Sequence, residues 1–391
     1  MSEITNFGLF RYFFYLGSTV FGGPLAIIDM MRYDLVMNKK WLKFSEFEDI
    51  FGYAQIAPGP LAFQVAVYFS YFKKGFWGAV AGGMGFVLPS FFLVLAFSFF
   101  YLTYKDITYI VNCLYGLSPV IIAIIFYSGF KLSTSILKKE IILYLLFAAS
   151  IILTVFFKVY IIFLIVGAAI ISVVYYSISE KKINKNKLSI FFLYIIPIAV
   201  LGFSKVILFI KEISVSKMLE MALLFLKVGS LTYGSGFVIV GVLKQEVVDA
   251  RHWLTAKEFI DGIAFGQITP GPVVITSTFI GYIMQGIPGA IISTICIFLP
   301  TFIFVLILAR QIGKYKDNFY LKSLIKGANA AAIGAILSTA YLLSKDAIID
   351  IPTFILFVAA LPVLFFTKIK SIYIIIAAAL AGILIKTFIF P

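Results

Sequence analysis

Apolar residues occur in long runs along this chain, separated by short polar stretches. The runs fall near 7–27, 50–72, 76–104, 109–131, 140–157, 159–178, 189–210, 219–243, 260–284, 287–311, 320–343, 349–366 and 371–390. Most contain about the 20 residues that an apolar helix needs to cross a bilayer. The pattern therefore predicts an all-α polytopic membrane protein with about 13 transmembrane segments.

Composition supports this class and excludes several others. The chain is 62% hydrophobic and 13% charged, whereas a soluble domain is about 25% charged. The net charge of +14 comes from clusters between the apolar runs, such as Lys73-Lys74. The positive-inside rule accounts for these clusters, so no nucleic-acid partner is expected. Two cysteines and one histidine offer no metal-ligand spacing, and no cofactor is expected.

An internal repeat is the strongest signal in the sequence. A shift of 212 residues aligns 41–60 with 253–272, and ten of these twenty residues are identical without a gap. The identical positions include a Pro-Gly-Pro triplet in each half, preceded by Gln55 or Gln267. Apolar composition alone would not align these polar residues, so the sequence predicts a duplication.

The repeat divides the chain into residues 1–180, a linker 181–212 with a central transmembrane helix, and residues 213–391. Six segments in each half and one between them predict that the second repeat is inverted in the membrane. The N-terminus, which we interpret as retained mature sequence, is expected in the cytoplasm of a plasma-membrane protein. This orientation also places loop 244–258 inside, and the basic loop 28–49 is its one exception.

Two kinds of helix break occur in each half. Pro58-Gly59-Pro60 and Pro270-Gly271-Pro272 interrupt apolar runs, since proline removes a backbone donor and glycine adds freedom. Matching breaks in two halves are typical of transporter binding sites, although inherited structural kinks are an alternative. A half-helix is expected after each triplet, with free amides at 61–63 and 273–275 that can bind an anion.

Glycine-rich turns lie upstream in each half, at Gly22-Gly23-Pro24 and Gly234-Ser235-Gly236. The predicted substrate-binding set joins these turns to the two breaks and to nearby amide side chains, which are good neutral donors to an oxyanion. The set comprises Gly22, Gly23, Gln55, Pro58, Gly59, Pro60, Leu61, Gln64, Gly234, Ser235, Gly236, Gln267, Pro270, Gly271, Pro272 and Val273.

Charged residues in or beside apolar runs are candidates for attracting the anion or for coupling. They are Arg32, Asp49, Lys227, Lys244 and Asp261. Lys227 lies inside an apolar run. Its charge is either buried there, which is costly, or carried to the membrane interface by its long side chain. Asp49 and Asp261 are equivalent in the duplication; helix capping is the favoured interpretation, and a protonation site is the alternative.

These motifs resemble the chromate ion transporter family in its long, two-domain form. The resemblance rests on Phe21-Gly22-Gly23-Pro24, 54–60, Phe86-Val87-Leu88-Pro89-Ser90, 232–236 and 266–272. It implies a plasma-membrane protein that exports chromate. Two residues depart from the family pattern, namely Leu61, where the first domain usually has Glu, and Ser235, where a glycine is usual.

The sequence therefore favours a secondary transporter that moves chromate or a similar tetrahedral divalent oxyanion by alternating access. No phosphate-binding loop is present, so an ion gradient is expected to drive it. The expected partners are a small inorganic oxyanion, the lipid bilayer and a proton or counter-ion. The sequence leaves open whether the protein forms a homodimer. Alternatives are another anion such as sulfate or an organic acid, a membrane enzyme, or a scaffold.

Overall fold

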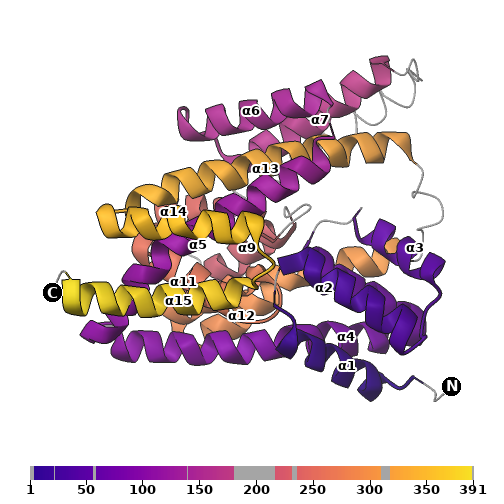
Figure 1. Ribbon diagram of the computed structural model, residues 1–391. Helices are drawn as coiled ribbons and strands as arrows, with labels where there is room; N and C mark the ends of the chain where they lie inside the picture. Colours follow the sequence, from indigo (N-terminus) through magenta and orange to yellow (C-terminus); the bar gives the residue numbers. More distant parts are fainter. Residues whose placement is uncertain are drawn as a thin grey trace.

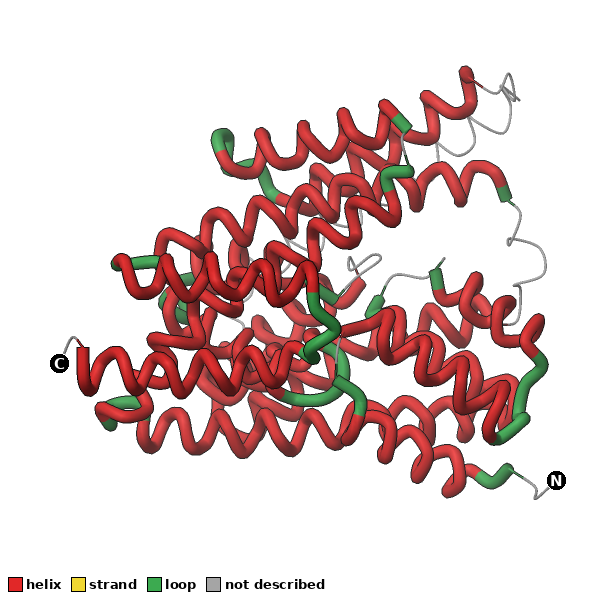
Figure 2. The backbone as a smooth tube through the Cα atoms, viewed as in Figure 1, coloured by secondary structure: helices red, strands yellow, loops and turns green. Residues whose placement is uncertain are grey.

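The structure, a computed structural model, describes residues 4–21, 23–55, 59–138, 140–179, 216–230, 236–309 and 318–389. The expected central helix at 189–210 lies outside these ranges. Within them every element is helical, as Figure 2 shows. The first half contains α1 (Asn6–Thr19), α2 (Gly23–Arg32), η1 (Tyr33–Asn38), α3 (Phe44–Ala54), α4 (Leu61–Tyr104), α5 (Thr108–Ile136), α6 (Ile141–Val155) and α7 (Ile161–Ser179).

The second half has a similar order of elements. It contains α9 (Lys217–Ser230), α10 (Val238–Leu243), η2 (Lys244–Ala250), α11 (Ala256–Ile268), η3 (Val273–Ile275), α12 (Thr276–Ala309), α13 (Phe319–Ala347), α14 (Ile351–Phe366), α15 (Ser371–Leu384) and η5 (Ile385–Ile389). Among the described residues, 6 helices are long and apolar enough to cross a membrane, three in each half. The chain is therefore a multi-pass helical membrane protein.

The helices α4 and α12 each fold back on themselves at one equivalent position. Gly75 and Gly286 have φ of +63° and +62°, a conformation that glycine adopts easily. A Cβ on Gly82 would overlap the Ser70 side chain, although 12 residues of straight helix would separate them by about 18 Å. Each helix therefore has a short arm (61–73 and 276–284) and a long arm (76–104 and 287–309).

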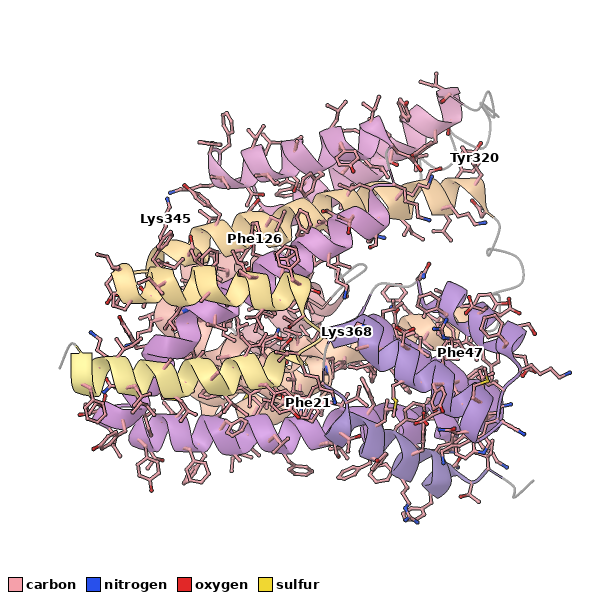
Figure 3. All side chains as sticks on the ribbon, in the orientation of Figure 1. Phe21, Phe47, Phe126, Tyr320, Lys345 and Lys368 are labelled. Carbon is pink, nitrogen blue, oxygen red and sulfur yellow. The ribbon has the colours of Figure 1, made fainter. Side chains whose placement is uncertain are left out.

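Helix α1 runs parallel to the long arm of α4 and stops halfway along it. A Cβ on Gly17 would lie 2.5 Å from the carbonyl oxygen of Phe86, and one on Gly85 would lie 2.6 Å from that of Phe10. Gly229 meets the Ile297 carbonyl in the equivalent way. Figure 3 places Phe21, which follows α1, near the middle of the molecule.

The chain then returns to the end where it began. Trp41, in the loop after η1, packs on Tyr12 of α1 and stacks on Phe69 in the short arm of α4. Figure 1 shows α1, α2 and α3 on the side that carries the N-terminus, whereas the C-terminus lies at the opposite side. The apolar run 7–27 is thus not one continuous helix, because the chain reverses its direction between α1 and α2.

This reversal changes which loops share an end of the molecule. Loop 28–49 lies at the same end of the molecule as the N-terminus, whereas continuous segments would place it at the opposite end. At the far end of the long arm of α4, Lys105 lies 3.9 Å from Glu258, next to loop 244–258. Loop 244–258 and its equivalent in the duplication, residues 32–46, therefore lie at opposite ends of that arm.

Candidate functional site

The first Pro-Gly-Pro triplet separates α3 from the short arm of α4. α3 ends at Ala54, and α4 begins at Leu61, as the sequence predicts for a half-helix after Pro60. The first α-helical bond runs from the Gln64 amide to the Pro60 carbonyl, at 3.0 Å. The amides of 61–63 therefore lie ahead of the helical bonding pattern. Pro58 is outside the described residues.

The second triplet, Pro270-Gly271-Pro272, follows α11, and the helix after it starts differently. Residues Val273–Ile275 form the 3-10 turn η3, and α12 starts at Thr276. The Ile275 amide donates to the Pro272 carbonyl at 3.0 Å, so the expectation of a free Ile275 amide is wrong. The tighter 3-10 turn starts its bonding one residue earlier than an α-helix. The amides of Val273 and Val274 precede it.

Each triplet packs against a hydroxyl residue of the other half. Gly271 has φ +113° and lies against Ser90, whose hydroxyl donates to the carbonyl of Pro270. Gly59 has φ +137° and lies against Thr301. Ser90 and Thr301 are equivalent at an offset of 211 residues, and both are 0% exposed. The contact is thus reciprocal and joins the two halves at the middle of the long arms.

Sequence reasoning missed Ser90 and Thr301 as site residues. Ser90 ends one of the stretches that carry the family resemblance, and Leu88-Pro89-Ser90 matches Leu299-Pro300-Thr301 in the duplication. That match was the available signal. The hydroxyl oxygen of Thr301 is buried, and no described residue bonds to it.

The three candidate glutamines occupy different environments. Gln55 caps the end of α3 and is exposed, whereas Gln267, its equivalent in α11, is half-buried. The amide nitrogen Nε2 of Gln267 is buried and has no hydrogen-bond partner in the part of the chain that the structure describes. Gln64 is fully buried in the short arm of α4. Of the three glutamines, Gln267 therefore remains the best candidate donor for an anion.

One glycine-rich turn can be followed to the second triplet. A Cβ on Gly236 would lie 3.3 Å from Val274 and 3.8 Å from Val273, so this turn packs on the residues whose amides precede η3. Gly23 begins α2. The other members of the two turns in the predicted set, Gly22, Gly234 and Ser235, lie outside the described residues.

The charged candidate Lys227 does not face the triplets as an isolated cation. Its Nζ lies 2.5 Å from Oε1 of Glu246, which is 1% exposed. Arg251 bonds both Glu246 and Glu220. Glu246 is therefore a buried acid between two cations, and the charges of this cluster offset each other locally.

Arg32 and Lys244 pair with acids of their own segments. Arg32 is exposed and lies 3.1 Å from Asp29. Lys244 lies 2.8 Å from Asp249. Neither ion pair includes a residue of the two triplets.

The equivalent acids Asp49 and Asp261 do not cap their helices. At the start of α3, Glu46 accepts from the Lys43 amide, and at the start of α11 Thr255 and Glu258 bond each other's amides. Asp261 lies further along α11, is 1% exposed, and accepts a bond of 3.0 Å from the Tyr101 hydroxyl. Asp49 is partly exposed. The capping interpretation is therefore wrong for both.

These features define a class, a duplicated multi-pass membrane protein whose interrupted helices meet at the middle of two long helices, beside hydroxyl and amide groups. The profile of the chromate transporter family matches residues 7–173 and again 219–383. The chain belongs to the chromate transporter family.

Its relatives cover nearly the whole chain. The chromate transport protein of Cupriavidus metallidurans is 34% identical over 376 residues, or 96% of this chain and 92% of the relative. The probable chromate transport protein of Synechococcus elongatus is 33% identical, with coverage of 96% and 94%. The chromate transport protein of Pseudomonas aeruginosa is 28% identical, with coverage of 96% and 92%. These relatives are named as transport proteins, and no solved structure matches the chain.

Proposed function

We propose that this chain exports chromate, or a similar tetrahedral divalent oxyanion, across the plasma membrane. The observation that carries the proposal is the reciprocal contact of Gly271 with Ser90 and of Gly59 with Thr301. This contact puts each break against the other half, and in this proposal the amides after Pro60 and Pro272 are the donors that bind the anion without a cation. The names of the relatives supply the substrate.

In this proposal the two halves, 1–180 and 213–391, are inverted repeats joined by a helix in 181–212, with about 13 apolar segments in all. The position of equivalent loops at opposite ends of the long arm of α4 supports the inversion. Rocking of one repeat against the other would expose the central site to each side in turn, which is alternating access. Without a phosphate-binding loop in the sequence, an ion gradient is the proposed energy source.

We place the N-terminus in the cytoplasm. Loop 28–49, whose basic residues were the exception to the positive-inside rule, lies at the N-terminal end and so satisfies it. Loop 244–258 then faces outward, the reverse of the assignment from continuous segments. Its cations Lys244 and Arg251 pair with Asp249 and Glu246, so they contribute little net positive charge.

Flux measurements in proteoliposomes test the function. The purified protein should accumulate labelled chromate when a pH gradient or membrane potential is imposed, and protein-free liposomes should not. Unlabelled molybdate, another tetrahedral divalent oxyanion, should compete. Absence of chromate flux under every imposed gradient would contradict the proposal.

Sulfate is the second candidate substrate, because Leu61 stands where the first domain of chromate exporters usually has Glu. The same liposomes distinguish the two anions. A lower apparent Michaelis constant for sulfate than for chromate would make sulfate the substrate and leave the mechanism unchanged.

A further inference from the structure

Asp261 is a buried acid at a contact between the two halves of the chain. It lies on α11, and its oxygen Oδ2 accepts a bond of 3.0 Å from the hydroxyl of Tyr101 on the long arm of α4. Its other oxygen, Oδ1, is buried and has no partner among the residues that the structure describes. No lysine or arginine in the described ranges forms an ion pair with it.

The nearest charges offset each other. Lys257 and Glu258, one helical turn before Asp261, act on it with opposite sign. Lys105 lies beside Glu258 at the end of α4, and Asp106 follows it on the exposed surface.

The other elements packed on α11 add no facing cation. From α5 the uncharged thiol Cys113 lies near Asp261, and α12, α15 and η3 contain no charged residue. All charged residues of α13 are exposed, and those of η2 are paired, Lys244 with Asp249 and Glu246 with Lys227 and Arg251. Leaving a carboxylate ionised in such surroundings costs free energy, and binding a proton removes that cost.

An apolar cavity adjoins this pair. It has a volume of about 430 Å³ and is lined by Tyr101, Cys113 and Phe265, together with residues of α15. The Tyr101 ring also packs on Phe279 of α12. This apolar space therefore lies directly beside the Tyr101 side chain.

We propose that Asp261 is the proton-binding site that couples transport to a pH gradient. Tyr101 is a positioning residue, whose hydrogen bond to Asp261 depends on the conformation. In the described conformation the Tyr101 hydroxyl stabilises Oδ2. When the two halves move relative to each other this bond breaks, and the affinity of the carboxyl group for a proton changes. The proton comes from water at one side, forms an O–H bond at Oδ1, and returns to water at the other side.

The proposed site belongs to the second half. Asp49, the equivalent residue in the first half, is partly exposed. Along α11, Asp261 lies between Glu258 near the surface and Gln267 beside the second triplet. A proton bound there is therefore close to the central site along one helix, about 9 Å from Gln267 at 1.5 Å per residue.

Infrared difference spectroscopy on the protein in lipid tests proton binding without any transport. Acidification should produce the carbonyl band of a protonated carboxylic acid that is absent in Asp261→Asn and shifted in Tyr101→Phe. Asp346→Asn, which changes an exposed acid of α13, should retain the band. A spectrum of Asp261→Asn identical to that of the unmodified protein would overturn the proposal.

Flux measurements test coupling, which rests on the proposed function. Asp261→Asn should still exchange labelled for unlabelled chromate across the liposome membrane but should lose stimulation by a pH gradient. Stimulation that persists in Asp261→Asn would overturn the coupling role. Unmodified protein that moves no chromate yet shows the infrared band would contradict the proposed function and leave the proton site standing.

Discussion

Two glycines explain why the breaks can meet hydroxyl residues of the opposite half. Gly59 and Gly271 have φ of +137° and +113°, which side chains with a Cβ rarely adopt. A Cβ on either would also overlap Thr301 or Ser90. The sequence predicted the glycines as breaks, but it could not predict their partners, because these lie on another helix and in the other half.

Replacing Gly271 by alanine tests this contact. The new Cβ would strain the backbone by about 1–3 kcal/mol and would push Ser90 from the Pro270 carbonyl. Chromate flux should fall to background. Gly167→Ala is the matched control, since no atom lies near its Cβ position and its φ is ordinary. Normal flux in Gly271→Ala would show that the contact is not part of the site.

The unpartnered amide of Gln267 gives a second prediction at this scale. Gln267→Leu should weaken oxyanion binding about 10- to 100-fold, because a hydrogen bond to a charged group contributes about 1.5–3 kcal/mol. Gln55→Leu, at the exposed equivalent position, should have the smaller effect. Equal affinities in both variants and the unmodified protein, measured by equilibrium binding of labelled chromate, would remove the glutamines from the site.

At the scale of elements, the positions of the helix breaks could be predicted from the sequence, whereas the course of the chain between them could not. Two prolines around a glycine indicate a helix break, and Pro60 and Pro272 correctly marked the next helical starts. The reversal after Phe21 was missed, whereas the one at Lys74-Gly75 falls between the predicted segments 50–72 and 76–104. An apolar run has the same composition whether it crosses the bilayer or returns at half depth, so hydropathy alone cannot distinguish them.

The half-helix account predicts different results for a proline and for a cation. Pro272→Ala lets η3 and α12 extend toward the triplet, so the Val273 amide enters a helical bond and flux should collapse with expression retained.

Lys227→Gln removes one partner of the buried Glu246, which Arg251 still binds. It should lower the thermal midpoint and should affect chromate affinity little. If Lys227→Gln transports no chromate while Pro272→Ala still transports it, the side-chain cation holds the anion.

For the whole molecule, the duplication could be predicted because it aligns Trp, Asp, Gln and Pro, which apolar composition does not align by chance. The end of the molecule at which each loop lies could not be predicted, because a reversal inside an apolar run changes the end at which the following loop lies. The same offset recurs in the backbone, where Lys40 and His252 have φ of +51° in equivalent loops. Because both residues are exposed, they are a matched pair of positions at which labelling can test the membrane topology.

Single cysteines at Lys40 and His252 should react with an impermeant thiol reagent from opposite faces of the membrane. The background should have Cys113 and Cys296 replaced by alanine, since both native cysteines are free. Lys40→Cys should react from the cytoplasmic face, and His252→Cys from outside. Reaction of both from one face would mean that the repeats are parallel, and alternating access between inverted halves would not apply.

The location of the bound anion tests the central claim most directly. Anomalous scattering from chromium in crystals of the protein with chromate would give that location independently of any flux. We expect one peak between the two triplets, within hydrogen-bond distance of the Val273 amide and Gln267. A peak beside Lys227 and Arg251, with none between the triplets, would contradict the account.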